Sequence, residues 1–259
     1  MEHLPLELKE EIAYDLPLSS LMNLCLTSKS LLQVCEDRSF WSLKLSEFGI
    51  DPSELKENDS KQIAYNFYAL LHETNITLEE LQRIIKEFQL LLGLETYTES
   101  FLALLELIGD AKMYGKTSFV FQEAKTEEIN EYFYDALDVE LYDLAAFLYY
   151  FTKGIEEDEV LEKGVQNEKL LRAIAKRFFM FETPLSDLLP GHNYYTLKNA
   201  IARGQKAFVE TYFEELLEAF ERFKRDEIKR LSSIINDVAQ NTHNPGILRE
   251  YRNILEYNF

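Results

Sequence analysis

Apolar residues recur at helical spacing from the start of the chain. In residues 4–16 every fourth position is aliphatic, and such a stripe drifts only about 40° per step on a helix of 3.6 residues per turn. Pro5 suits the first turn, and Pro17 ends the segment because a proline biases the preceding residue away from helical geometry. The pattern predicts a short amphipathic helix between two prolines. Its stripe consists of Leu4, Leu8, Ile12 and Leu16.

Two further helices are predicted within the first forty residues. Leu21, Leu24 and Cys25 mark the second helix, and a Leu-Leu pair followed by Cys35 marks the third. Three such helices form a compact bundle that is too small to bury a large hydrophobic core by itself. The next stretch, "SFWSLKLSEFG", closes this unit with the apolar residues Phe40, Trp41, Leu45 and Phe48.

Helix-start signals organise the rest of the chain. "DPSE" offers Asp51 as an N-cap, proline at the first helical position and an acidic residue three positions later, so we expect a helix and a domain boundary there. "TLEE" and "TYTE" are capping boxes ahead of apolar runs. Residues 205–240 carry apolar residues at three-to-five spacing and predict one long amphipathic helix.

These patterns predict an all-α fold with an N-terminal module, 1–50, and a helical domain, 51–259. Only nine glycines and six prolines punctuate the chain, which leaves few tight hairpin turns for a large sheet. Helix pairs in the second domain recur at a loose period near 33, as in stacked helical-hairpin repeats. A degenerate repeat array and an irregular helical array both remain open.

The net charge of the chain disfavours some classes of binding partner. The formal net charge is −19, from 46 acidic and 27 basic residues, so the field repels phosphate backbones and anionic lipid. We therefore expect neither nucleic acid nor membrane as a partner. No apolar run approaches the roughly 20 residues that span a bilayer, and no secretory leader is recognisable. The chain is expected in the cytoplasm or nucleus and not to be secreted.

Candidate enzyme chemistry is weak. "IGDAKMYGKTS" resembles a phosphate-binding loop, but Gly109 and Gly115 are separated by five residues instead of four, so a loop between helices is expected. The four histidines are scattered singly, without metal-ligand spacing. Cys25 and Cys35 are interpreted as small core residues of a reducing compartment. We expect no catalytic residues, no cofactor and no metal site, and the protein is not expected to be an enzyme.

The N-terminal segment carries the only specific signal. Residues 3–45 resemble an F-box, a family that begins with Leu-Pro and closes with an acidic residue shortly before Phe/Leu-Trp. The end of this pattern is occupied by Asp37, Phe40 and Trp41. The matching positions before it are Leu4, Pro5, Glu7, Leu8, Ile12, Leu16, Leu21, Leu24, Leu26, Ser28, Lys29, Leu31, Leu32, Val34 and Cys35. The third helix lacks the aromatic residue that the family often places there.

The resemblance implies a function in protein docking. F-boxes bind the Skp adaptor of a cullin-RING (SCF) ubiquitin ligase, and the remainder of the chain selects a protein substrate for ubiquitination. Trp41 and Phe40 are expected to fix the F-box to the following domain. The family pattern assigns the adaptor contact to Leu4, Pro5, Leu8, Ile12, Leu16, Leu21 and Leu24.

Residues 51–259 match no family securely. Their helix pairs weakly resemble the ankyrin-type repeats of F-box proteins of large DNA viruses, which would place the chain in a host cell cytoplasm. The alternative function is a stand-alone helical interaction scaffold, in which the F-box-like segment only caps the second domain. Burial separates the two hypotheses, because a capping segment would cover Leu4, Ile12 and Leu16 with residues beyond 60. The substrate, the oligomeric state and the source of the adaptor are not encoded in any recognisable pattern.

Overall fold

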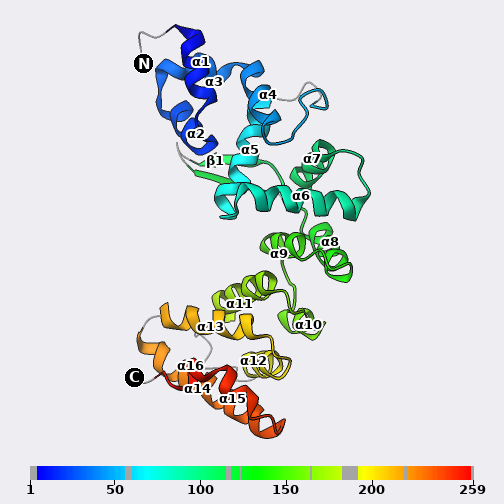
Figure 1. The fold of residues 1–259 in the computed structure, drawn as a ribbon, viewed down its shortest axis with the longest axis vertical. Helices are drawn as coiled ribbons and strands as arrows, with labels where there is room; N and C mark the ends of the chain where they lie inside the picture. Colours follow the sequence, from blue (N-terminus) through cyan, green and yellow to red (C-terminus); the bar gives the residue numbers. More distant parts are fainter. Residues whose placement is uncertain are drawn as a thin grey trace. The chain divides into compact units, whose positions relative to one another are not determined.

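The computed structural model describes residues 5–55, 60–114, 118–122, 124–163, 165–182, 192–218 and 221–257. Helices dominate them, which confirms the expected all-α class, and strand is confined to one short hairpin (Figure 1). The helices are α1 (Leu6–Tyr14), α2 (Leu18–Thr27), α3 (Leu32–Glu36), α4 (Arg38–Ser46), α5 (Ser60–Glu73), α6 (Leu78–Leu92), α7 (Tyr97–Ile108), α8 (Thr126–Asp138), α9 (Tyr142–Phe151), α10 (Glu157–Glu162), α11 (Glu168–Glu182), α12 (His192–Ala202), α13 (Lys206–Glu218), α14 (Glu221–Asn241), α15 (Gly246–Glu250) and α16 (Arg252–Leu255). A 3-10 turn, η1 (Lys29–Leu31), precedes α3.

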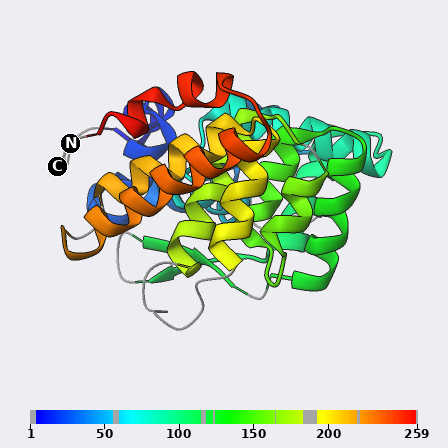
Figure 2. The same ribbon diagram turned by 90° about the horizontal axis from the view of Figure 1, so that it is seen from below.

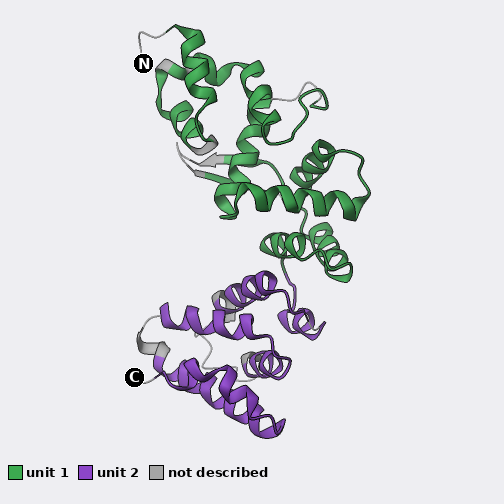
Figure 3. Ribbon diagram, viewed as in Figure 1, with its two compact units in different colours: residues 1–153 green, residues 154–259 purple. Residues whose placement is uncertain are grey.

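Two compact units divide the chain, residues 1–153 and 154–259 (Figure 3). In unit 1, α1 packs on α3 and α4, and α2 packs on η1 and α5. The most extensive packing between the N-terminal helices and the rest of unit 1 joins α4 to α5. This packing crosses residue 50, so the N-terminal helices and the following helices are in direct contact. The boundary expected after residue 50 stays a prediction.

The capping boxes behave largely as the sequence predicts. The Thr77 hydroxyl accepts from the Glu80 amide while the Glu80 carboxylate accepts from the Thr77 amide, so both halves of the box close at the start of α6. At α7 the Thr96 hydroxyl accepts from the Glu99 amide, but the Glu99 carboxylate reaches the amide of residue 95. Both threonines satisfy amides that a helix start leaves without partners.

The prediction of a helix start at "DPSE" is wrong. Residues 51–55 form a turn, and the next described helix, α5, begins at Ser60. Asp51 does accept from the backbone and hydroxyl of Ser53, which gives an Asx-type turn. Glu54 does not close a box; its carboxylate accepts from the Thr96 hydroxyl at the start of α7. The Glu54 carboxylate, which the predicted capping box would have bonded to the backbone near Asp51, is bonded to Thr96 of a distant segment instead.

The expectation of a plain loop at "IGDAKMYGKTS" is also corrected. Strands β1 (Ala111–Tyr114) and β2 (Ser118–Phe121) form an antiparallel hairpin in which Ala111 is opposite Phe121. Residues 115–117 of this fragment lie outside the described part of the chain. The preceding segment is helix α7, as expected, so the strand that a phosphate-binding loop requires is not present before Gly109.

The helices of unit 2 contact one another in alternation. α10 packs on α12 and α12 on α14, while α11 packs on α13, so first helices contact first helices and second helices contact second helices. A repeat array over residues 51–259 stays a prediction, and this alternating contact order is the one that stacked helical hairpins have. The buried Gln205 amide nitrogen supports it by donating to the carbonyls of Leu161 and Val165, which joins the α12–α13 turn to the end of α10 and the segment after it.

The single long helix predicted over residues 205–240 is wrong. The structure has two helices there, α13 and α14, which pack against each other and lie side by side (Figures 1 and 2). Residues 219–220 between them lie outside the described part of the chain. Helix propensity is a weak preference that tertiary packing overrides, and folding back lets two apolar faces cover each other.

Candidate protein-docking surface

Helix α1 presents an apolar face to solvent. Leu8 is 45% exposed and Ile12 is 40% exposed, and Pro5 is also exposed just before the helix. These three residues fall within about 60° of one another around the helix, whereas buried Ala13 lies about 100° from Ile12 and faces the core. Two aliphatic anchors four residues apart, on a helix that buries a different face, are the pattern by which a helix enters a partner's groove.

The other residues that the family pattern assigns to this surface are distributed differently. Leu16 and Leu24 are half-buried, and Leu21 is fully buried together with Met22. Leu4 lies outside the described residues. The exposed set therefore consists of Pro5, Leu8 and Ile12, with Leu16 and Leu24 partly accessible. Leu21 is covered by the protein's own chain, so its side chain packs in the core and holds α2 in place.

A buried lysine holds α1 in place. The Lys44 ammonium donates to the Tyr14 carbonyl oxygen over 2.6 Å, lies 2.8 Å from the Glu47 carboxylate, and sits 5.0 Å from the Tyr14 ring centre. The residue is only 5% exposed. A cation at the C-terminal end of a helix complements the partial negative charge of the last carbonyls. The Glu47 carboxylate, which accepts from the Tyr14 hydroxyl, raises the pKa of that phenol above its ordinary value.

Replacing Lys44 with methionine should loosen α1. Methionine keeps most of the side-chain volume but leaves the Tyr14 carbonyl and Glu47 without their cation, so we expect a loss of about 1–3 kcal/mol in the free energy of unfolding. Urea denaturation followed by circular dichroism measures it, and amide exchange should rise in α1. The matched control is Lys86→Met at an exposed position of α6, for which we expect a change within about 0.5 kcal/mol. Equal stability of the two variants would contradict this role of Lys44.

The residues that close the family pattern serve structure. Asp37 is the N-cap of α4, and its carboxylate accepts from the amides of Ser39 and Phe40. The fully buried Trp41 donates its indole hydrogen to the Cys35 carbonyl at 2.8 Å and packs edge-on against Tyr65 of α5, with ring centres 5.8 Å apart. The expectation that Trp41 fixes these helices to the following region is confirmed.

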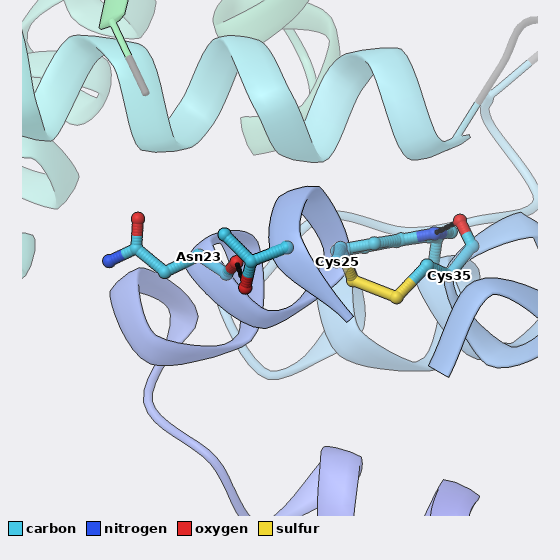
Figure 4. The surroundings of a disulfide bond; sticks show 5 residues. Asn23, Cys25 and Cys35 are labelled. Carbon is cyan, nitrogen blue, oxygen red and sulfur yellow. Dashed lines mark hydrogen bonds between the residues drawn. A yellow bond between two sulfur atoms is a disulfide. The ribbon is translucent and has the colours of Figure 1, made fainter. Parts of the chain in front are cut away.

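Cys25 and Cys35 are joined by a disulfide, which corrects the interpretation of both as reduced core residues (Figure 4). Cys35 is buried as expected, and Cys25 is half-buried. The turn at η1 brings the end of α2 back toward α3, so that the two Cα atoms are 5.6 Å apart. The sequence placed the cysteines on neighbouring helices but contained nothing that fixed this distance.

A groove of about 680 Å³ lies between α5, α7 and the β-hairpin. Asn66 organises its floor, since its amide oxygen accepts from Gln62 and from the Ala111 amide while its nitrogen donates to Asp110. The lining includes two carboxylates and two lysines, and its described residues include no histidine. This is not the pocket of convergent acidic and histidine side chains that an enzyme hypothesis required.

The described residues show no metal cluster and no membrane-spanning helix. No group of three or more His, Cys, Asp or Glu side chains is placed to hold a metal ion in the part of the chain that the structure describes. Among the same residues, every helix is too short or too polar to cross a bilayer. His3 and the side chain of His192 lie outside the described set.

The N-terminal helices form a small bundle that Lys44 and Trp41 brace from within and that exposes aliphatic side chains on its first helix. The family model of the F-box domain matches residues 1–43. The N-terminal segment of this chain is therefore an F-box domain, which confirms the resemblance found in the sequence. None of the curated proteins and none of the solved structures matches the chain. The likeness of residues 51–259 to ankyrin-type repeats stays a prediction.

Proposed function

We propose that this chain is a substrate receptor that docks on the Skp adaptor of a cullin-RING (SCF) ubiquitin ligase and presents residues 51–259 to a protein substrate. The F-box match at residues 1–43 is the observation that carries the proposal. The exposed side chains of Leu8 and Ile12 support it, because they form an apolar surface that a partner could cover. The chain itself contributes docking and positioning, and the ubiquitin transfer takes place on other proteins of the ligase.

The proposed docking surface consists of Pro5, Leu8 and Ile12, with Leu16 and Leu24 at its edges. Leu4, which the family pattern also assigns to it, lies outside the described residues. Aliphatic side chains that leave water on binding contribute through the area they bury, roughly 25 cal/mol per Å². Anchors spaced four residues apart enter a groove together, so their contributions reinforce one another. Lys44 keeps α1 in the orientation that presents both anchors.

A rigid connection between docking and capture supports the receptor function. Trp41 packs on Tyr65, and the hydroxyls of Ser42 and Ser60 lie 2.9 Å apart, so α4 and α5 are joined at two points. A substrate held by unit 1 would then keep a fixed position relative to the adaptor. The negative charge of residues 51–153 favours a protein partner that is neutral or basic, since this part of the chain carries 20 acidic and 8 basic residues. Residues 154–259 are closer to neutral, with 18 acidic and 15 basic residues.

Titration of the full chain with purified Skp adaptor tests the proposal. We expect saturable binding that Ile12→Ala weakens about tenfold, because truncating an interface anchor typically costs more than 1 kcal/mol. Calorimetry measures both affinities. Absence of binding by the wild-type chain, with the chain folded by circular dichroism, would end the receptor proposal. Co-purification from cell extract with the wild-type and Ile12→Ala chains then separates adaptor-dependent proteins from those held by residues 51–259.

The alternative function is a stand-alone interaction scaffold in which the F-box caps the helices after it. The packing of α4 and α2 on α5 favours it, since a cap needs such contacts. The same titration distinguishes the two functions, because a scaffold predicts no affinity for the adaptor. Under this alternative, Ile12→Ala would also leave the co-purified proteins unchanged.

A further inference from the structure

The Cys25–Cys35 bond lies inside the F-box, where it joins α2 to α3 (Figure 4). The Cα separation of 5.6 Å is in the range that disulfides adopt without backbone movement. The two cysteines differ in exposure, because Cys25 is half-buried near the end of α2 and Cys35 is 2% exposed in α3. A reagent in solution therefore meets the Cys25 side first.

The bond connects the two parts of the proposed docking surface. On one side it holds α2, which carries the half-buried Leu24 next to Cys25. On the other side it holds α3, where the Cys35 carbonyl accepts the Trp41 indole hydrogen. Trp41 belongs to α4, and Lys44 of the same helix holds the end of α1. The α2 part of the surface is thus tied covalently to the elements that brace the α1 part.

Docking on a ligase adaptor takes place in a compartment where glutathione and thioredoxin keep most thiols reduced. Disulfides in that environment are mostly transient or redox-sensing. We propose that Cys25 and Cys35 form a reversible oxidation site, whose closure orders α2 and so preorganises the docking surface; its effect on adaptor binding rests on the proposed function. The oxidised, bonded form binds the adaptor more tightly, and reduction loosens α2 and weakens binding.

The chemistry uses a peroxide as oxidant and a dithiol as reductant. In oxidation, the Cys25 thiol loses its proton, the thiolate attacks a peroxide oxygen and the O–O bond breaks. The departing hydroxide takes up that proton, so a sulfenic acid and one water result. The Cys35 sulfur then attacks the Cys25 sulfur, the S–O bond breaks, and a second water carries away the hydroxyl and the Cys35 proton. Two thiols and one hydrogen peroxide give one disulfide and two waters. In reduction, one thiolate of a dithiol attacks the Cys25 sulfur, and Cys35 leaves and takes up a proton. The second thiol of the reductant then attacks the mixed disulfide at the reductant's own sulfur, so the reductant closes its disulfide and Cys25 leaves and takes up a proton.

The test compares the full chain after treatment with hydrogen peroxide and after treatment with dithiothreitol. Alkylation and mass spectrometry count the free thiols, and hydrogen exchange monitors the amides of α2. Reduction opens a loop of about ten residues, so we expect faster exchange in α2 and a Tm lower by about 5–10 °C. We expect the adaptor affinity to fall about threefold to tenfold, because the surface is less preorganised. The fluorescence of Trp41, whose indole contacts Cys35, reports the same transition.

The control is Cys25→Ala/Cys35→Ala, which should match the reduced wild type under both treatments. Thiols that peroxide does not couple, or equal α2 exchange in the two states, would overturn the inference even where the adaptor binds. Equal adaptor affinity of the oxidised and reduced chains would likewise contradict the proposed effect of the disulfide on docking. If the adaptor binds neither state while α2 exchange still responds to reduction, the proposed receptor function fails and the oxidation site stands.

Discussion

The double substitution Leu8→Asp/Ile12→Asp is expected to weaken adaptor binding by at least about 100-fold and to leave the fold intact. Both side chains are substantially exposed in the free chain, at 45% and 40%, so two carboxylates there remain hydrated before binding. In a complex they would have to leave water without a partner, which costs several kcal/mol per ion. Calorimetric titration with the purified adaptor measures the loss, and urea denaturation should show a change within about 1 kcal/mol.

A matched control separates the docking surface from exposed apolar surface in general. Leu90 lies on α6, outside the F-box, and is 74% exposed. Leu90→Asp adds the same chemical group at an even more exposed aliphatic position, so we expect wild-type affinity. If Leu90→Asp weakens binding as much as the double variant does, the effect is one of net charge. If the double variant binds as tightly as wild type, the adaptor contact lies elsewhere on the chain.

The sequence predicted features that depend on neighbours within one helical turn. Thr77 and Thr96 act as N-caps because their partners lie three residues away in the same segment. The same reasoning failed at Glu54, whose carboxylate bonds to Thr96, far along the chain. It also failed for α13 and α14, because an uninterrupted apolar pattern does not show where a chain reverses to cover itself.

The face of α1 that carries the proposed docking surface was predictable in part. Periodicity placed Leu8 and Ile12 on one face of α1, but it could not show whether this face turns inward, since a core-facing stripe has the same spacing. Leu21 illustrates the limit, because it matches the family pattern as well as Leu8 does and yet is buried. Lys44 was missed altogether. Its position between buried Trp41 and Leu45 is the signal that could have shown a cation directed into the bundle.

The disulfide and the β-hairpin required three-dimensional information. Ten residues separate the cysteines in the sequence, and only the turn at η1 brings them into bonding distance. The hairpin contains Lys112 and Met113 in a stretch without strong alternation, and Asn66 of α5 holds its first residue through the Ala111 amide. Such long-range hydrogen bonds stabilise a local structure that the segment's own composition does not favour.

Trp41→Ala is expected to destabilise unit 1 more than any other single change discussed. The side chain is fully buried, packs on Tyr65 and Phe40, and satisfies the Cys35 carbonyl. Removing a buried aromatic ring of this size costs about 3–5 kcal/mol through lost contacts and the cavity that remains. Trp41 is the only tryptophan, so unfolding must be monitored by far-ultraviolet circular dichroism instead of fluorescence.

Trp41→Phe separates the packing of the ring from the hydrogen bond. Phenylalanine keeps an aromatic ring against Tyr65 but cannot donate to the Cys35 carbonyl, so its loss should be smaller, about 1–3 kcal/mol. Because Trp41 links α3 to α4 and α4 to α5, the alanine variant should also speed amide exchange in α5, beyond the F-box itself. If exchange rises only within residues 5–46, the F-box folds independently of α5 and the rigid connection between docking and capture is absent. Exchange that rises in both segments together would mean that the F-box and the proposed substrate-binding part of unit 1 share one cooperative core.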